Sequence, residues 1–441
     1  MNQSTHAEKV TVQAAAGSIQ GRVKNGALLF AGIPYAKAPV GSLRFRPPQP
    51  LAGFAEPYPA LKFSPAAPQI PSGGMTDNTP VRWSEDCLYL NVSAPVEALE
   101  ANDSSDRAVM VWIHGGGYTS GQGAIPWYNG NRFAKNNDIV VVSINYRLGA
   151  LGFADLTHLG EEFATSNING TLDQIAALRW VQDNIAAFGG DPSRVTIAGE
   201  SAGGFSVATL LACPSAEGLF QQAIPQSGAC HHTLPQEASK KVTEHFLGEL
   251  GLNSAVELEA ASAEDILAAQ KATTAYFSQG AGQVNSLGVA VSPFYPVHGN
   301  TTLPEDPLTA ARNGASDTVR VLIGSNKDET TLWSVGETDQ EKLERTVAGY
   351  QAEEALVVYQ RTRPKASSHD LLVAITTDHM FRIPAIRLAE ARQGAAATYM
   401  YQFNWRSRAL DGALAATHSL EIPFAFDNLD QAGVDFFLGP G

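Results

Sequence analysis

The pentapeptide Gly199-Glu200-Ser201-Ala202-Gly203 decides the fold, and it directly follows the apolar run RVTIA at 194–198. An apolar, β-rich run that meets the pattern GxSxG is typical of a strand that turns sharply into a helix. The small residues allow a close backbone approach, and the strained turn lifts the Ser201 Oγ clear of the sheet. The positive end of the helix would then stabilise negative charge that develops beside it. We therefore predict that Ser201 is an accessible nucleophile.

Further apolar runs flank this pentapeptide, at 108–117, 138–149, 318–326 and 397–405. Before the pentapeptide, residues 169–188 carry apolar side chains at three- and four-residue spacing, which is typical of an amphipathic helix. The run Gly189-Gly190-Asp191-Pro192 supplies its stop signal. Because near-continuous apolar strands alternate with helices, the sequence predicts an α/β fold with a mostly parallel central sheet and helices on both faces.

Two segments differ from this pattern. Residues 9–92 contain short alternating runs and a proline-rich stretch, which predict small strands and loops at a sheet edge. Residues 234–282 are rich in Ala, Glu and Leu, and they predict helices that form a possible cap over the sheet. The sequence shows no internal repeat or low-complexity linker, so we expect one catalytic domain over residues 1–441.

A glycine-rich motif, His114-Gly115-Gly116-Gly117-Tyr118, follows the apolar run at 108–113. Glycines at this position allow backbone N–H groups to face a substrate carbonyl without a Cβ in the way. The helix that begins after Ser201 adds the N–H of Ala202. We predict an oxyanion hole formed by Gly116, Gly117 and Ala202; an ordinary glycine turn is the alternative.

A serine nucleophile also requires a base and an acid that orients the base. In folds with the GxSxG turn the chain order is nucleophile, acid, base. Asp328 and Glu329 directly follow the predicted strand at 318–326, and either could be the acid. His418 lies in a predicted loop after the last evident strand and is the favoured base, although spacing alone leaves His298 and His379 open.

The chain resembles the type-B carboxylesterase family, which includes bacterial para-nitrobenzyl esterases, eukaryotic carboxylesterases and cholinesterases. The resemblance follows the family's order through most of the chain. It rests on GIPYAKAPVGSLRF at 32–45, SEDCLYLNV at 84–92, HGGGY at 114–118, NYRLGALGF at 145–153, NIAAFGGDP at 184–192, GESAGG at 199–204, QSG at 226–228, GSNKDE at 324–329 and HSLEIPFAF at 418–426.

This resemblance implies an α/β-hydrolase fold and a serine carboxylesterase that acts through an acyl-enzyme intermediate. It places the catalytic triad at Ser201, Glu329 and His418, and the oxyanion hole at the same three residues as above. It also implies structural ion pairs of Arg44 with Glu85 and of Arg147 with Asp173. The implied substrates are small-molecule esters with a short to medium acyl chain or an aryl group, and no metal or organic cofactor is required.

The sequence departs from the family in three places. No cysteine precedes Cys87, which secreted members pair with an earlier one, so a reduced protein is expected. The family's PV-x-DG segment is Pro296-Val297-His298-Gly299 here, with histidine in place of aspartate. The sequence also ends at Gly441, where members usually continue with further helices, which predicts a shortened or truncated C-terminal part.

Composition and charge limit the partners and the location that can be expected for this chain. The net charge of −14 disfavours nucleic acid as a partner, and no run of roughly 20 apolar residues predicts a membrane span. No signal peptide is evident, so a cytoplasmic location is expected. Cys87, Cys213 and Cys230 are predicted to be buried free thiols. Two alternatives stay open: a non-catalytic binding or adhesion protein on the same scaffold, and a lipase, amidase or carbamate hydrolase.

Overall fold

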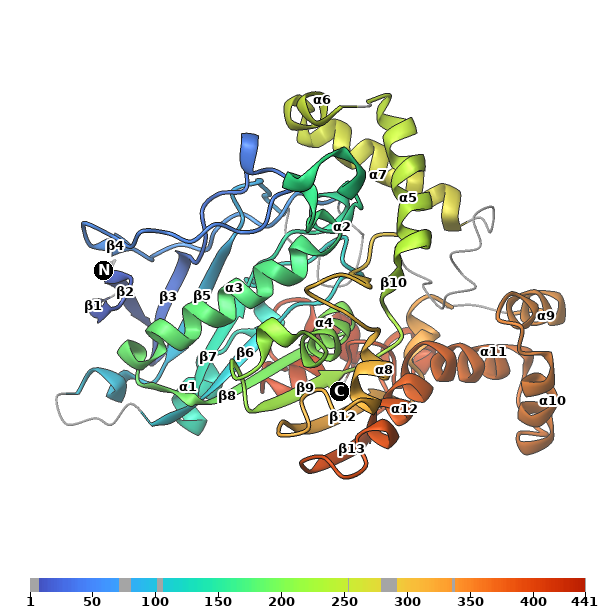
Figure 1. Ribbon diagram of the computed structural model, residues 1–441. Helices are drawn as coiled ribbons and strands as arrows, with labels where there is room; N and C mark the ends of the chain where they lie inside the picture. The colour runs from blue at the N-terminus through green and yellow to red at the C-terminus, as the bar shows by residue number, and fades with distance from the viewer. Residues whose placement is uncertain are drawn as a thin grey trace, which may run out of the picture.

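The computed structural model describes residues 8–70, 81–100, 106–252, 254–278, 292–334 and 338–440. A large twisted sheet runs through its centre (Figure 1). In spatial order the sheet contains β1 (Lys9–Ala14), β2 (Gly17–Lys24), β3 (Ala27–Pro34), β5 (Tyr89–Ala94), β7 (Val140–Ile144), β6 (Arg107–Ile113), β8 (Gly190–Glu200), β9 (Gln222–Gln226), β12 (Arg320–Asn326) and β13 (Thr398–Phe403), with β4 (Tyr58–Pro59) beside β2. A second small sheet pairs β10 (Leu234–Pro235) with β11 (Val297–His298).

The two halves of the main sheet differ in strand direction. From β1 to β7 successive strands in this order are antiparallel, although β4 runs parallel to β2, and from β7 to β13 they are parallel. The antiparallel half comes from residues 9–94, which agrees with the predicted small strands at a sheet edge. Parallel strands require long crossovers, and helices supply them, so the predicted α/β architecture is confirmed.

Alternate residues of the central strands face two separate cores. On β6, Val109 and Val111 belong to the larger core, whereas Trp112 belongs to the smaller one. This alternation follows from the two-residue period of a strand. The helices that bury the larger core are α3 (Asn169–Asn184), α4 (Ala202–Leu211), α8 (Pro307–Arg312) and α12 (Ile383–Ala391). On the other face lie α1 (Asn131–Asn137), η3 (Pro126–Tyr128), α13 (Ile422–Ala425) and α14 (Val434–Leu438).

Helix α3 ends close to the predicted position. It continues as the 3₁₀ helix η7 (Ile185–Phe188), and Gly189 then caps it in the left-handed conformation with φ of 80°. Strand β8 begins at Gly190, four residues before the predicted start at Arg194, and it includes Pro192. Proline is tolerated at the beginning of a strand because few ladder bonds are lost there.

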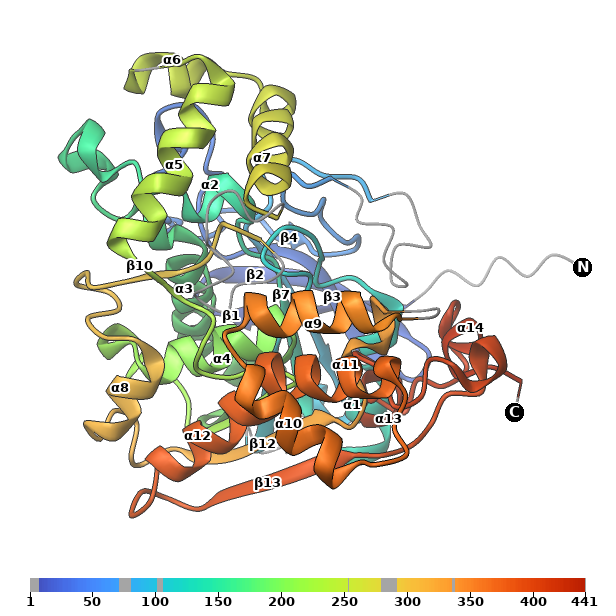
Figure 2. The same ribbon diagram turned by 90° about the vertical axis from the view of Figure 1, so that its right-hand side faces the viewer.

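Two groups of helices lie outside the sheet layers (Figures 1 and 2). The described part of segment 234–282 forms α5 (Gln236–Leu250), α6 (Ala255–Ala260) and α7 (Ala263–Ser278), as predicted, while residues 253 and 279–282 lie outside the described residues. The second group, α9 (Gln340–Gly349), α10 (Glu353–Thr362) and α11 (Ser368–Thr377), has a small core of its own. The sequence analysis made no prediction for this group. A π-helix, η11 (Asp378–Arg382), joins α11 to α12.

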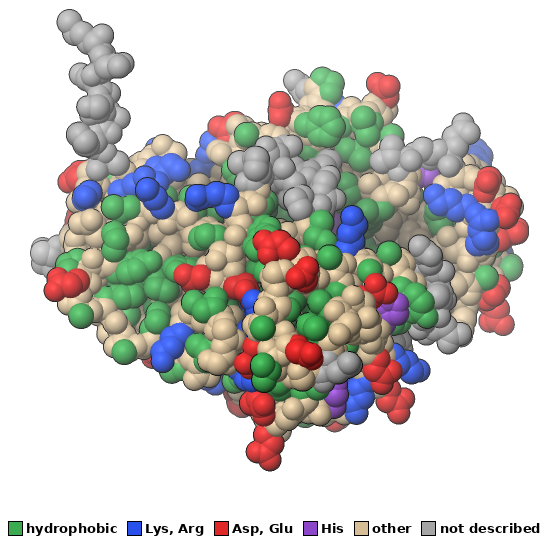
Figure 3. Space-filling view, turned by 90° about the horizontal axis from the view of Figure 1, so that it is seen from above, with side chains coloured by type: hydrophobic (Ala, Val, Ile, Leu, Met, Phe, Trp, Pro, Cys, Tyr) green, Lys and Arg blue, Asp and Glu red, His purple; other side chains and the backbone are tan. Residues whose placement is uncertain are grey.

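Acidic and basic side chains are interspersed among apolar ones on the face drawn in Figure 3. Cys87, Cys213 and Cys230 are buried and free, as predicted. Within the described ranges, no helix combines the length and apolar character that crossing a membrane requires.

Candidate active site

Ser201 occupies a sharp turn between β8 and α4. Its backbone has φ of 58° and ψ of −124°, which is a strained conformation for a residue other than glycine. The neighbouring glycines permit this turn: a Cβ on Gly203 would lie 2.0 Å from the Ile113 carbonyl oxygen, and one on Gly199 would lie 2.6 Å from the Gly203 carbonyl carbon. The pattern GxSxG is therefore required by close packing of β6 against the turn.

The glycine-rich loop after β6 lies against this turn. A Cβ on Gly115 would lie 3.0 Å from the Ser201 Cβ, and Gly116 has φ of 111°, which favours glycine. Among the described residues, no acceptor is hydrogen-bonded to the backbone N–H groups of Gly116, Gly117 and Ala202. These N–H groups are thus free to bind an oxygen atom beside Ser201.

His418 and Glu329 form a buried pair. The His418 Nδ1 lies 2.7 Å from the Glu329 Oε2, and the His418 backbone N–H donates to the Glu329 carbonyl at 3.1 Å. The other carboxylate oxygen, Oε1, accepts from the Asn326 N–H at 2.7 Å. Glu329 begins the 3₁₀ helix η10 (Glu329–Leu332) near the end of β12, and His418 lies in a loop after β13. These bonds fix the orientation of the imidazole ring.

A second carboxylate, that of Glu200, faces the opposite ring nitrogen. The His418 Nε2 lies 3.1 Å from the Glu200 Oε1, which also accepts from the Ser419 Oγ at 2.8 Å. Within the described chain, no hydrogen bond joins the Ser201 Oγ to His418. Burial disfavours the charged imidazole, but the carboxylates of Glu200 and Glu329 outweigh this effect and raise the pKa of His418 to about 9.

The pKa values of two acids near His418, Glu200 and Glu421, are also raised. Burial is the main cause for Glu200, because its carboxylate has little contact with water. Burial likewise raises the pKa of Glu421, and the charges of Glu200 and Glu329 add to the effect. Glu421 accepts from the Asn326 side chain and from the Ser227 Oγ. The sequence analysis assigned no role to Glu200 or Glu421.

Ser201 and His418 line the same cavity of about 210 Å³. Gly116 and Gly117 also line it, so the structure brings the predicted nucleophile, base and loop together. The apolar and aromatic walls are formed by Trp112, Ile125, Trp127, Tyr128, Phe205, Leu332, Trp333, Phe381, Ile422 and Phe437. The sequence analysis assigned none of these wall residues to a pocket.

The other residues considered from sequence lie elsewhere. Asp328 is 3.7 Å from Arg406 and lines a different cavity. His379 stacks on Tyr350 with ring centroids 4.0 Å apart. The His298 Nδ1 pairs with the Thr233 hydroxyl at 3.1 Å.

Both predicted ion pairs are present in the structure. Arg44 bonds both carboxylate oxygens of Glu85 at 2.6 Å. Arg147 bonds Asp173 through its Nε at 2.8 Å and its Nη2 at 2.7 Å.

Comparison with known proteins identifies the family. The model of the carboxylesterase family matches residues 8–433, and the chain therefore belongs to this family. The para-nitrobenzyl esterase of Bacillus subtilis (strain 168) is 38% identical over 425 residues, which cover 94% of this chain and 82% of the relative. The phenmedipham hydrolase of Pseudarthrobacter oxydans is 35% identical over 435 residues, with the same coverage of 94% and 82%.

Solved structures agree with this assignment. A thermophilic PNB esterase superposes with a TM-score of 0.85 at 36% identity, covering 98% of this chain and 86% of that chain. A carboxylesterase of Geobacillus stearothermophilus at pH 6.2 has a TM-score of 0.82 at 37% identity, with the same coverage. The chain has the α/β-hydrolase fold and is a carboxylic ester hydrolase.

Proposed function

We propose that Ser201, His418 and Glu329 act as the catalytic triad of a serine carboxylesterase that works through an acyl-enzyme intermediate. The observation that carries this proposal is the buried 2.7 Å contact between the His418 Nδ1 and the Glu329 carboxylate, close to the strained turn at Ser201. This contact orients the imidazole, and the carboxylate stabilises the imidazolium that forms when a proton is taken up.

In the first half of the reaction, His418 takes the proton of the Ser201 hydroxyl while the Oγ attacks the ester carbonyl carbon. The carbonyl oxygen becomes an oxyanion, and the free N–H groups of Gly116, Gly117 and Ala202 stabilise it, each by about 3 kcal/mol. When the tetrahedral intermediate collapses, the bond to the alcohol oxygen breaks, and His418 donates its proton to the leaving alcohol.

In the second half, His418 takes a proton from water, and the resulting nucleophile attacks the acyl-enzyme. The bond between the Ser201 Oγ and the acyl carbon breaks, the Oγ regains a proton from His418, and the carboxylic acid leaves. His418 takes up and returns the proton in both halves of the reaction.

The Nε2 of His418 must be unprotonated for the first step. Its contact with the Glu200 carboxylate favours the imidazolium, so Glu200 and His418 compete for one proton. The pKa of His418, about 9, is higher than that of Glu200, about 7, so a proton shared by the two rests on His418 near neutral pH, and His418 becomes available as a base as the pH rises.

The cavity supports small-molecule esters as the substrate class. A volume of about 210 Å³ with aromatic walls suits a short to medium acyl chain or an aryl group. The name of one relative, para-nitrobenzyl esterase, describes an ester with an aryl group, which supports this class. We further propose that residues 1–441 act as one catalytic domain and that segment 234–282 is its helical cap.

The experiment that tests the triad is the hydrolysis of para-nitrophenyl acetate and butyrate, followed by the release of nitrophenolate. The parent chain is expected to be active, and Ser201→Ala is expected to lose about 10⁴-fold or more in kcat. Ser215→Ala removes an exposed hydroxyl and serves as the matched control, with activity close to the parent. Full activity in Ser201→Ala would contradict the proposal, and a folded but inactive parent would favour a binding role on the same scaffold.

A second measurement separates an esterase from an interfacial lipase. The rate on a triglyceride is measured below and above its solubility limit. The proposed esterase shows no jump in rate when droplets form, whereas a lipase does.

A further inference from the structure

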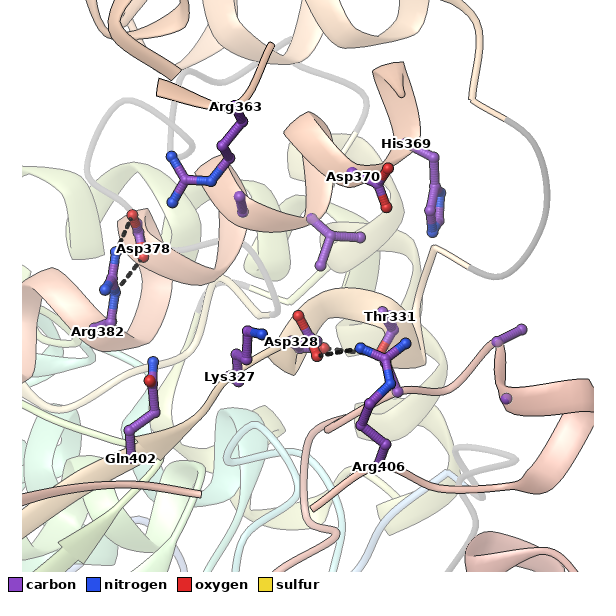
Figure 4. A pocket seen from close by; sticks show the side chains of 15 residues that line it. Lys327, Asp328, Thr331, Arg363, His369, Asp370, Asp378, Arg382, Gln402 and Arg406 are labelled. Carbon is purple, nitrogen blue, oxygen red and sulfur yellow. Dashed lines mark hydrogen bonds and ion pairs between the residues drawn. The ribbon is translucent and has the colours of Figure 1, made fainter. Parts of the chain in front are cut away.

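A second cavity, of about 620 Å³, lies apart from the one that contains Ser201 (Figure 4). Residues that follow β12, the end of α10, helix α11, η11 and strand β13 contribute to its walls. The charged side chains that line it are Lys327, Arg363, Arg382, Arg406, Asp328, Asp370 and Asp378. This excess of basic over acidic groups contrasts with the net charge of −14 for the whole chain.

Two of the acidic groups are already engaged by partners in the protein. Asp378 accepts two bonds from the Arg382 guanidinium and one from the Tyr359 hydroxyl. Asp370 accepts from the backbone N–H and the hydroxyl of Ser367, at 2.9 and 2.8 Å, and these bonds hold the pKa of Asp370 below its usual value. The charge of Asp378 is therefore compensated by Arg382, whereas Asp370 keeps its negative charge because its partner Ser367 is neutral.

The remaining basic groups are weakly engaged. Within the described chain, Lys327 forms no ion pair with an acidic side chain. Arg363 bonds the Thr362 hydroxyl at 3.3 Å and lies over the Tyr359 ring, which are uncharged partners. Arg406 is 3.7 Å from Asp328, and its side chain is 62% exposed. With Arg382 paired to Asp378, Lys327, Arg363 and Arg406 face the two carboxylates of Asp328 and Asp370, so the lining keeps a net positive charge.

The basic groups of this cavity come from different elements of the fold. In Figure 4, Gln402 extends from the sheet and Lys327 from the position that follows β12. Arg363 extends from the end of α10, and Arg406 lies next to Asp328. Val373 and Ala374 add an apolar wall from α11. A ligand that satisfies this arrangement carries separated negative charges on a carbon skeleton.

We propose that this cavity binds a small organic polycarboxylate, whose carboxylates pair with Lys327, Arg363 and Arg406. The guanidinium groups can each form two parallel bonds to a carboxylate, and the lysine adds a point charge. The volume lies within the range of ligand cavities in proteins. A compact anion such as phosphate fits less well, because it cannot reach basic groups on separate walls and its dense charge faces Asp328 and Asp370.

This site is separate from the proposed catalytic one. Asp328 lines the second cavity, whereas the next residue, Glu329, bonds His418. Binding of a polycarboxylate can therefore be measured with or without ester hydrolysis.

The test is calorimetric titration of the full chain with citrate at low ionic strength, because exposed charges are screened by salt. Citrate is expected to bind one saturable site. Lys327→Gln and Arg363→Gln each remove one charge-assisted contact and are expected to weaken binding roughly tenfold. Arg361→Gln is the matched control: it removes the same charge from the last turn of α10, two residues before Arg363, and is expected to change the affinity less than about twofold.

Acetate and inorganic phosphate, at matched ionic strength, test the class of ligand. Both are expected to bind at least about tenfold more weakly than citrate. The absence of saturable citrate binding would overturn the proposal. An equal loss of citrate affinity in Arg361→Gln and Lys327→Gln would also overturn it, because this would indicate a general attraction of anions. Binding of phosphate or acetate as tight as that of citrate would contradict the proposed class of ligand.

Discussion

At the residue scale, the position of a proton between His418 and Glu200 controls the proposed base. Catalysis requires neutral His418, so kcat/KM rises as the pH passes through the pKa of this histidine. Glu200 and Glu329 raise that pKa to about 9. Glu200→Gln removes one of these charges and therefore lowers the pKa. We expect the rise of kcat/KM to move to lower pH by about one unit, measured as a pH profile with para-nitrophenyl acetate.

Glu217→Gln is the control for this shift. Glu217 is exposed, so the loss of its charge is expected to leave the profile in place. An unchanged profile in Glu200→Gln, or a rise displaced to higher pH, would show that Glu200 does not set the protonation of His418.

A second pair of variants distinguishes the two neighbouring acids. Glu329→Gln keeps a hydrogen-bond acceptor near the His418 Nδ1 but removes the charge that stabilises the imidazolium. We expect kcat to fall about 10⁴-fold, as in triads whose acid is replaced by its amide. Asp328→Asn is expected to stay within a few-fold of the parent, because Asp328 does not contact His418. A larger loss in Asp328→Asn than in Glu329→Gln would show that Asp328, and not Glu329, is the acid of the triad.

Motifs and chain order predicted Ser201 as the nucleophile, and they left Asp328 or Glu329 as the acid. The family resemblance chose Glu329 and His418. Neither the motifs nor the resemblance indicated that the Glu200 carboxylate meets the Nε2 of His418. Glu200 is adjacent to Ser201 in the sequence, but its contact partner, His418, lies far along the chain. Such a contact depends on how the loop after β13 packs against β8, and no local pattern encodes it.

At the scale of elements, the turn between β8 and α4 depends on the absence of a side chain at Gly203. In Gly203→Ala the added Cβ would lie 2.0 Å from the Ile113 carbonyl oxygen, so β6 or α4 must move. We expect the free energy of unfolding to fall by at least about 2 kcal/mol, measured by urea denaturation.

Gly248 provides the opposite case within a helix. It lies in α5, and a Cβ built on it meets no atom within 4 Å. Gly248→Ala is therefore expected to raise the free energy of unfolding by about 0.5–1 kcal/mol, because alanine loses less backbone entropy in a helix. If both substitutions destabilised the protein equally, close packing would not explain the glycine at 203.

The elements that the sequence predicted share a strong local pattern. β6, β7, β8 and β12 are near-continuous apolar runs, and α3 has a clear helical period with a glycine stop. β9 was missed because it is short and contains Pro225, which is unfavourable inside a sheet. Helices α9 to α11 were missed because α10 has no buried residue among those described, and the group is stabilised by its own small core rather than by the sheet.

At the scale of the whole molecule, distant segments are joined by buried charged groups. Arg147 follows β7, and its guanidinium bonds both Asp173 on α3 and the backbone carbonyl of Arg46 at 2.7 Å. The arginine thus connects the parallel half of the sheet, a helix that covers it and the N-terminal segment. The family resemblance indicated the pair, whereas the link to Arg46 became evident in the structure.

Breaking this connection tests its contribution to stability. The side chains of Arg147 and Asp173 are 3% and 0% exposed, so removal of the arginine leaves a buried carboxylate without its charged partner. Arg147→Gln is expected to lower the free energy of unfolding by about 3–5 kcal/mol in urea denaturation. Arg345→Gln breaks an exposed pair with Glu341 on α9 and is expected to cause no measurable change, because water solvates both groups. A similarly small effect in both variants would mean that the pair contributes little to holding these segments together. In that case the Asp173 carboxylate would be neutralised by protonation when Arg147 is absent, because burial raises its pKa.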